Sequence, residues 1–176
     1  SGPRFLVRFF AGNNLNKSLC DFPDAISQAY QVGVPMGGTL NATNLSNLSI
    51  FISAKADASL ENQYLEKVQI VKGVLRGDEI HTTVIDVIDD QQTTLDESSC
   101  EIIGKGKKSI CAIWHDPSFD NQENAYYYAR VVANKSCRWS HQLCISNPDY
   151  CVDDSDFETP KFIQERAWTS PIWLEN

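Results

Sequence analysis

The sequence lacks the local motifs by which enzymes and metal proteins are often recognised. It has no Cys-x-x-Cys, His-x-His or His-Glu-x-x-His pattern, which argues against a zinc ribbon, a thioredoxin-like redox site or a local metal motif. It also has no Gly-x-Ser-x-Gly nucleophile motif. The glycine-rich stretch 33–38 contains Pro35 and Met36, so its spacing does not fit a phosphate-binding loop. We therefore assign no catalytic residue and no metal ligand to this chain.

Basic residues are also in short supply. Fifteen Lys and Arg stand against twenty-three Asp and Glu, for a net charge of −8. That balance disfavours binding to nucleic acid or to an anionic membrane surface. No run of apolar residues is long enough to cross a bilayer. The sequence thus predicts a soluble, acidic, folded domain.

The length and the ends of the chain bear on domain organisation. With 176 residues, 42% of them hydrophobic, the chain fits one globular domain over residues 1–176. It opens without an initiator Met or a signal-peptide pattern and enters an apolar run at Phe5. We expect it to be a fragment of a longer protein.

Six cysteines suggest three disulfides and an oxidising compartment, periplasmic or extracellular. Six buried free thiols are the disfavoured alternative. The shortest loops would pair Cys100 with Cys111 and Cys137 with Cys144. Cys20 and Cys151 would then join the two ends of the chain, closing a long loop.

The residue pattern predicts one short helix near the N-terminus, from about residue 21 to Gly33. The remainder predicts a mostly β domain, an antiparallel β-sandwich of immunoglobulin-like or jelly-roll-like type. Its clearest hairpin joins residues 64–75 to 79–88 through the turn Arg76-Gly77-Asp78. Apolar residues on both faces place this hairpin centrally in a sheet. Further strands are expected at residues 5–10, 48–56, 109–114, 126–132 and 164–173.

Several polar groups have a functional and a structural interpretation. The acidic cluster Asp153, Asp154, Asp156 and Glu158 could bind calcium, but it lacks the EF-hand pattern and a solvated loop is favoured. His81, His115 and His141 are expected to be structural or surface residues. The five Asn-x-Ser/Thr sequons matter only if the source glycosylates. They lie at Asn16, Asn41, Asn44, Asn47 and Asn134.

The aromatic residues of the second half could build a sugar-binding platform. In strands such residues more often fill a core, which is the favoured interpretation. The set comprises Trp114, Tyr126, Tyr127, Tyr128, Trp139, Trp168 and Trp173.

Several longer phrases, taken together, resemble a known family. They are residues 1–4 with 7–10, 33–38, 67–73, 114–120, 123–132, 137–140 and 163–173. The chain resembles the C-terminal portion of proteins in the domain-of-unknown-function (DUF) family 3604, which are typically large exported bacterial proteins. The resemblance runs from end to end.

This resemblance implies a function for the chain. The family is similar to the polymerase-and-histidinol-phosphatase (PHP) superfamily of metal-dependent phosphoesterases, whose metal ligands would lie in a domain upstream of this chain. We therefore expect a non-catalytic accessory β-domain without a cofactor of its own, packed on the upstream catalytic domain that would hold a divalent metal. The resemblance also supports secretion and the Cys137–Cys144 bridge. The interface candidates are Gly33, Pro35, Met36, Arg166, Trp168 and Trp173.

The sequence is also compatible with two other functions. The chain could be a free-standing glycan- or protein-binding module that uses exposed Trp or Tyr, or, least favoured, a self-contained enzyme. A large exposed apolar patch would favour the accessory domain. An aromatic groove with polar rims would favour the binding module, and a pocket of converging acids and histidines would favour the enzyme.

Overall fold

The computed structural model describes residues 2–151 and 160–176. It is mostly β, with antiparallel pairing throughout except for one parallel pair, β3 with β12. Within the described residues, neither of the two α-helices has the length and hydropathy needed to cross a membrane. The acidic cluster Asp153, Asp154, Asp156 and Glu158 lies outside the described residues. The elements are β1 (Leu6–Gly12), α1 (Ala25–Val32), β2 (Val34–Pro35), β3 (Thr39–Asn41), β4 (Ser49–Lys55), β5 (Leu65–Arg76), β6 (Glu79–Asp89), β7 (Thr93–Leu95), β8 (Ile102–Gly104), β9 (Ser109–His115), β10 (Ala125–Cys137), α2 (Trp139–Ser146), β11 (Phe162–Trp168) and β12 (Ile172–Glu175), with short 3₁₀ turns at Lys17–Asp21, Ala42–Asn44 and Pro148–Tyr150.

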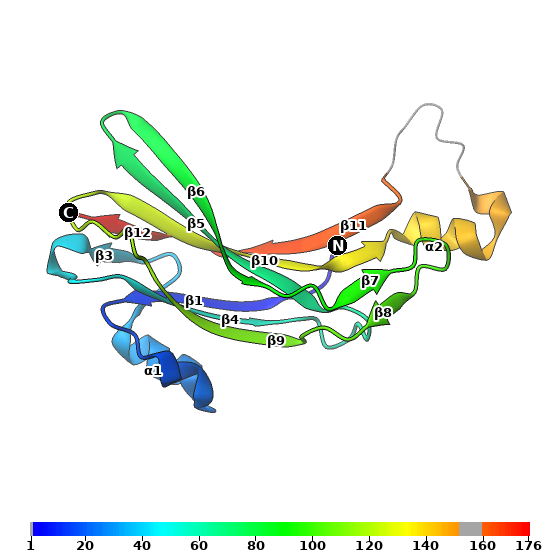
Figure 1. Ribbon diagram of the computed structural model, residues 1–176, viewed down its shortest axis with the longest axis horizontal. Coiled ribbons are helices and arrows are strands. Elements are labelled where there is room, and N and C mark those ends of the chain that lie inside the picture. The colour runs from blue at the N-terminus through cyan, green and yellow to red at the C-terminus, as the bar shows by residue number, and fades with distance from the viewer. Residues whose placement is uncertain (1, 152–159) are drawn as a thin grey trace.

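Two large sheets share one hydrophobic core (Figure 1). The smaller sheet has the strand order β2-β1-β4-β9, and the larger one β3-β12-β10-β5-β6, with β11 also paired to β10. Strands β7 and β8 form a separate two-stranded sheet. Each fully buried large side chain in the core contributes roughly 1.5–3 kcal/mol. These include Phe9, Ile50, Ile52, Leu65, Val68, Ile70, Tyr127, Ile172 and Leu174.

A second, smaller core forms on the other side of the first sheet. Phe10 and Phe51 point away from the main core and pack under Ala29 of α1. The helix begins after Asp24 and ends before Gly33, close to the predicted bounds. Tyr30 of this helix is 57% exposed and meets the ring of Phe10 edge-on, with centroids 4.7 Å apart.

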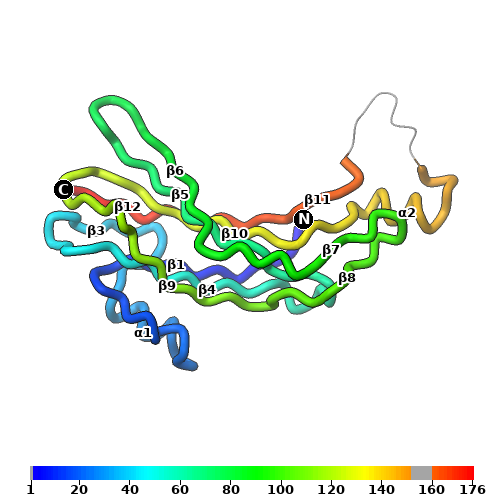
Figure 2. Tube along the Cα trace, viewed as in Figure 1, coloured from blue at the N-terminus to red at the C-terminus, as the bar shows by residue number. Residues whose placement is uncertain are grey.

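The predicted hairpin is confirmed, but its central position in the sheet is wrong for one strand. β5 pairs with β6 from Lys67 to Arg76, with one register shift between Val68 and Gln69. Gly77 takes the positive φ of 62° that a two-residue turn needs. β5 lies inside the sheet, whereas β6 is its edge. The tip of this hairpin stands away from the rest of the chain (Figure 2), and Ile80 and Val84 are exposed. Apolar residues on both faces of β6 therefore do not reflect burial.

The predicted final strand at 164–173 is two strands. β11 and β12 both pair with β10, and Pro171 lies in the break between them rather than at an outer end. Proline has no N–H to donate to a neighbouring strand. The pairing with β10 is therefore interrupted at Pro171, between the end of β11 and the start of β12. The helix α2 and the β7–β8 pair were not predicted.

All six cysteines form disulfides, but the expected pairings are wrong. The bonds join Cys20 to Cys111, Cys100 to Cys137 and Cys144 to Cys151. Neither the Cys137–Cys144 bridge that the resemblance supported nor the Cys20–Cys151 bridge forms. Cys111 alternates with buried Ile110 on β9, so it faces the 3₁₀ turn that carries Cys20 and not the loop that carries Cys100.

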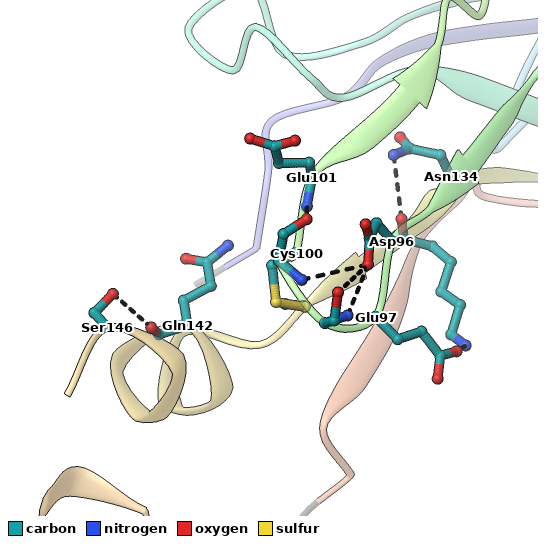
Figure 3. The surroundings of a disulfide bond; sticks show 11 residues. Asp96, Glu97, Cys100, Glu101, Asn134, Gln142 and Ser146 are labelled. Atoms are coloured by element: carbon teal, nitrogen blue, oxygen red, sulfur yellow. Dashed lines mark hydrogen bonds and ion pairs between the residues drawn. A yellow bond between two sulfur atoms is a disulfide. The ribbon is translucent and has the colours of Figure 1, made fainter. Parts of the chain in front are cut away.

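The Cys100–Cys137 bond fastens the loop before β8 to the end of β10 (Figure 3). In that loop the backbone N–H of Cys100 donates to the carbonyl of Asp96 at 2.8 Å. Lys135 of β10 also pairs with Glu97 at 2.6 Å. Disulfides of this kind suggest an oxidising environment.

The disulfide connectivity predicts different losses of stability. Replacing Cys20 and Cys111 by Ser opens a link across 91 residues and is expected to cost about 4–5 kcal/mol of unfolding free energy in the chain-entropy model. Replacing Cys144 and Cys151 opens a link across 7 residues and should cost about 2–3 kcal/mol. Urea unfolding of the two double variants measures this difference. An equal loss, or a larger one for the short loop, would contradict it.

Candidate functional site

The site lies on the outer face of the larger sheet and is set by the alternation of β10. Tyr127 points into the core and is 1% exposed. Since successive strand residues point to opposite faces, Tyr126 and Tyr128 point outward. The register places Trp173 of β12 beside Tyr126. It places Trp168 of β11 beside Arg130, the outward residue of β10 that follows Tyr128. We call Tyr126, Tyr128, Trp168 and Trp173 the outer aromatic face.

The rings of the outer aromatic face are close but still open to solvent. The rings of Tyr126 and Tyr128 lie nearly parallel, with centroids 6.3 Å apart and an angle of 9°. Trp173 meets Tyr126 at 5.6 Å and 61°. Trp168 is 58% exposed and Trp173 is 46% exposed. These two tryptophans therefore present apolar ring surface to water on the same face.

Two hollows adjoin at this face. The first, of about 400 Å³, is lined by all four aromatic residues together with Thr169 and Pro171. The second, of about 520 Å³, shares Tyr126 and Trp173 and extends to Leu75 and Ile80 of the hairpin. The Tyr126–Trp173 pair therefore forms a ridge between two open depressions.

Gly73 sets how Tyr126 lies. It is the cross-strand neighbour of Tyr126 on β5, and a Cβ added there would overlap the Tyr126 ring. The ring therefore lies flat over the backbone of β5 instead of standing upright. A side chain at position 73 would displace the ring and change the shape of both hollows.

A row of polar side chains lies beside the outer aromatic face. It crosses β10, β5 and β6 at the level of Arg130, two residues after Tyr128. Asp86 of β6 accepts a hydrogen bond from the Gln69 amide at 2.6 Å. The Gln69 carbonyl oxygen accepts from Arg130 Nε, also at 2.6 Å. Arg130 is in turn the cross-strand neighbour of Trp168. The outer face thus combines exposed rings with a polar rim that hydrogen bonds hold in place.

The structure brings together two of the segments that the resemblance singled out. The N–H of Gly37 donates to the carbonyl of Pro171 at 2.8 Å, and the N–H of Trp173 donates to Gly38 at 3.0 Å. The turn after β2 therefore borders the aromatic face.

The six interface candidates nevertheless divide into two groups. Trp168, Trp173 and Arg166 are exposed on the outer face. Gly33 ends α1 and Met36 packs against the main core, while Pro35 pairs with Phe10 of β1. The prediction that this set contacts an upstream domain remains untested.

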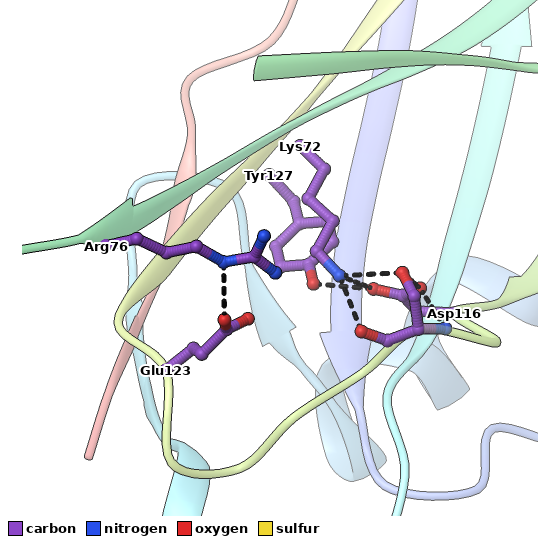
Figure 4. A network of polar contacts seen from close by, with 6 residues as sticks. Lys72, Arg76, Asp116, Glu123 and Tyr127 are labelled. Carbon is purple, nitrogen blue, oxygen red and sulfur yellow. Dashed lines mark hydrogen bonds and ion pairs between the residues drawn. The ribbon is translucent and has the colours of Figure 1, made fainter. Parts of the chain in front are cut away.

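A buried charged network lies behind the sheet, beneath the outer face (Figure 4). Lys72 Nζ donates to Asp116 at 2.7 Å and to the carbonyl and hydroxyl of Ser118. The Tyr127 hydroxyl donates to the same Asp116 carboxylate at 2.7 Å. These bonds tie the loop after β9 to β5 and β10. Lys72 donates three hydrogen bonds, which is all that an ammonium group can make.

The charged forms in this network are stabilised unequally. Burial alone would raise the pKa of Asp116, but hydrogen bonds from Lys72, Tyr127 and Ser118 outweigh it and lower the pKa. Burial, and then the bond to Asp116, raise the pKa of Tyr127. Asp116 is therefore ionised at neutral pH, and the phenol of Tyr127 is neutral.

The three histidines occupy separate surroundings. His115 hydrogen-bonds Ser49 at 2.8 Å, and His81 lines a cleft beside Lys72 and Trp114. His141 of α2 meets Phe162 edge-on at 5.4 Å. Over the described part of the chain, the one close His/Cys/Asp/Glu group is His141 with Cys100 and Cys137, whose sulfurs are bonded to each other.

The sequence analysis favoured a core role for the aromatic residues, and this is wrong for Tyr126, Tyr128, Trp168 and Trp173, which line the open face, whereas Tyr127 is in the core. The sequence analysis did not identify five polar residues, namely Gln69, Asp86, Arg130, Lys72 and Asp116. One signal was available for Arg130, because it continues the alternation that Tyr126 and Tyr128 begin. No local pattern links Lys72 to Asp116, which lie 44 residues apart.

Removing Lys72 should destabilise the chain strongly. Lys72→Met leaves Asp116 buried without its cation, and breaking such a pair costs about 3–5 kcal/mol. Lys105→Met, at an exposed position, is the control and should change little. Urea unfolding at neutral pH measures both.

The contribution of Asp116 to the free energy of unfolding should also depend on pH. Because its folded pKa lies below the ordinary value, its contribution is present above pH 4 and is lost as the pH falls through the folded pKa. If urea unfolding at neutral pH showed Lys72→Met to be as stable as Lys105→Met, the Lys72–Asp116 pair would contribute nothing to the free energy of unfolding.

Comparison with known proteins gives one match. The family model described as "Protein of unknown function (DUF3604)" matches residues 1–176, the whole chain. No significant match was found among curated proteins or among solved structures.

Proposed function

The chain belongs to the family of proteins of unknown function DUF3604, and on that premise we propose that it is a non-catalytic β-domain that binds carbohydrate on its outer aromatic face. One observation carries the proposal. Two exposed tryptophans and two nearly parallel tyrosines share one sheet face, beside a row of hydrogen-bonded polar side chains.

The chemistry of a sugar ring matches this combination. One face of a pyranose is made of C–H groups and packs on an aromatic plane, while hydroxyls at its rim need donors and acceptors. Flat apolar surface is supplied by Tyr126, Trp168 and Trp173. Rim partners are supplied by Arg130 and Thr169, which lie next to Trp168.

The face also has the extent that an oligosaccharide needs. The outer surface from β6 across β5 and β10 to β12 spans three strand spacings, roughly 14 Å. The two hollows of about 400 and 520 Å³ meet at the Tyr126–Trp173 ridge. Strands hold the rings, so the platform is formed before the ligand arrives.

The proposal extends to the fold type of the domain and to its cellular location. We propose that the two sheets form a β-sandwich, immunoglobulin-like or jelly-roll-like, covering the whole chain as one domain. Three disulfides support a periplasmic or extracellular location. The bacterial, exported origin rests on the resemblance to this family.

A second function is favoured by a different surface. The hairpin of β5 and β6 exposes Leu75, Ile80 and Val84, with Ile80 61% exposed. On this proposal the hairpin packs on an upstream metal-dependent hydrolase domain of the same protein, which would hold the divalent metal. The chain is then an accessory domain. The upstream domain would cover the hollow that Leu75 and Ile80 line, and the hollow at Trp168 would stay open for substrate.

Carbohydrate binding should depend on the exposed tryptophans. Trp173→Ala and Trp168→Ala are each expected to weaken binding at least tenfold, because each removes a flat surface that the ligand covers. Trp139→Ala is the matched control, since Trp139 is 70% exposed but lies on α2. Affinity electrophoresis in polysaccharide gels, followed by calorimetry with oligosaccharides, measures the effect. Equal retardation of all three variants would exclude the outer aromatic face as the site.

Docking of the hairpin should be visible in the full-length parent protein. Amide hydrogens of β6 are expected to exchange at least tenfold more slowly in the parent than in the isolated chain, because an edge strand becomes covered. The β4 amides, inside the other sheet, serve as the internal control. Identical β6 exchange in the two proteins would contradict docking through this hairpin.

A further inference from the structure

We infer that the carbohydrate bound by the outer aromatic face is anionic, carrying carboxylate or sulfate groups, and that Arg130 and Arg166 bind those groups. This inference rests on the proposed function and adds the class of ligand to it. It comes from the placement of two arginines beside Trp168 and from how their charges are compensated.

The two arginines flank Trp168 on the same face. Arg130 is the cross-strand neighbour of Trp168 on β10. Arg166 precedes Trp168 by two positions on β11, so both side chains leave the sheet on the same side. Arg166 is exposed and Arg130 is half-buried. A ligand lying on the Trp168 ring would therefore have a guanidinium group on two of its sides.

Neither arginine is neutralised by a neighbouring acid in the part of the chain that the structure describes. Lys67, on the same face, pairs with Asp89 at 2.9 Å and so carries no free charge. The remaining ion pairs of the described residues involve neither arginine. They are Lys72–Asp116, Arg76–Glu123, Lys107–Asp90 and Lys135–Glu97.

Arg130 is oriented without being neutralised. Its Nε donates to the neutral amide oxygen of Gln69, while its terminal nitrogens bond no acceptor among the described residues. Asp86 forms no ion pair with Arg130, because the Gln69 amide lies between its carboxylate and the guanidinium. The guanidinium is thus held in position by one hydrogen bond, with its remaining N–H groups left for a ligand.

The charge of the chain makes this arrangement informative. In a chain of net charge −8, Arg130 and Arg166 place two cations without an ion-pair partner among the described residues on the face that carries the aromatic rings. Guanidinium groups bind carboxylate and sulfate oxygens through paired hydrogen bonds, and they do so next to aromatic planes. A neutral sugar would leave both charges without a partner. A uronic acid or a sulfated sugar would satisfy them while its ring covers Trp168.

The experiment compares pairs of ligands that share a sugar backbone and differ in charge. De-esterified and fully methyl-esterified oligogalacturonides share one backbone, and sulfated and unsulfated galactan oligosaccharides form a second pair. Calorimetry at low salt is expected to show at least tenfold tighter binding of the anionic member of one pair. That preference should shrink at 0.5 M NaCl, because salt screens exposed charge contacts.

Variants separate this inference from the proposed function. Arg130→Gln with Arg166→Gln should remove the preference for the anionic member. It should weaken the neutral member to a smaller degree, because Arg130 is also a rim partner for sugar hydroxyls. Lys17→Gln with Lys105→Gln removes the same charge at exposed positions elsewhere and should keep the preference. Trp173→Ala should weaken both members.

Each other outcome has a definite meaning. If both members of each pair bind equally and the arginine variants change nothing, the ligand is neutral and this inference is overturned, while carbohydrate binding stands. If a folded wild-type chain binds no member of either pair, nor any polysaccharide in the gels, the proposed function fails together with the inference.

Discussion

The outer face depends on how β10 is held in the middle of the larger sheet. This strand pairs with β5 on one side and with β11 and β12 on the other. Its inward residues, Tyr127, Ala129 and Val131, are buried in the core that both sheets share. A shift of one residue would place Tyr126 and Tyr128 in that core and the inward set in water, so burial fixes the register. That constraint places Tyr126 and Tyr128 on the outer face, and the pairing of β11 and β12 with β10 places Trp168 and Trp173 beside them.

The buried network reinforces the same register from behind. Tyr127 both fills the core and donates its hydroxyl to Asp116, which Lys72 of β5 also holds. Each polar atom of this group has a partner, as buried charges require. The two strands that carry Gly73 and Tyr126 are therefore linked by side chains on the inner face as well as by the backbone ladder. That rigidity is what lets Tyr126 lie flat over Gly73 and form the ridge between the hollows.

Several elements could be predicted from the sequence, and the reasons that others could not are physical. The β5–β6 hairpin has a local signal, a turn with glycine between two β-branched runs, and it was predicted correctly. The alternation of 126–132 separates Tyr126, Tyr128 and Arg130 from Tyr127, Ala129 and Val131, but it does not tell which set meets water. Both sets are rich in apolar atoms, and only the opposing sheet decides. The disulfide pairings were predicted wrongly for a related reason. Distance along the sequence does not tell which face of β9 carries Cys111. The break at Pro171 and the exposed hairpin tip likewise depend on strands distant in the sequence.

The central claim is that the outer aromatic face binds a carbohydrate, and the four tryptophans offer a direct test. Each indole N–H gives its own signal in a nitrogen–proton correlation spectrum of the labelled chain. On titration with an oligosaccharide that binds, the Trp168 and Trp173 signals should move together and saturate, while those of Trp114 and Trp139 stay in place. Saturating shifts confined to Trp114 or Trp139, or equal small drifts of all four, would contradict the account.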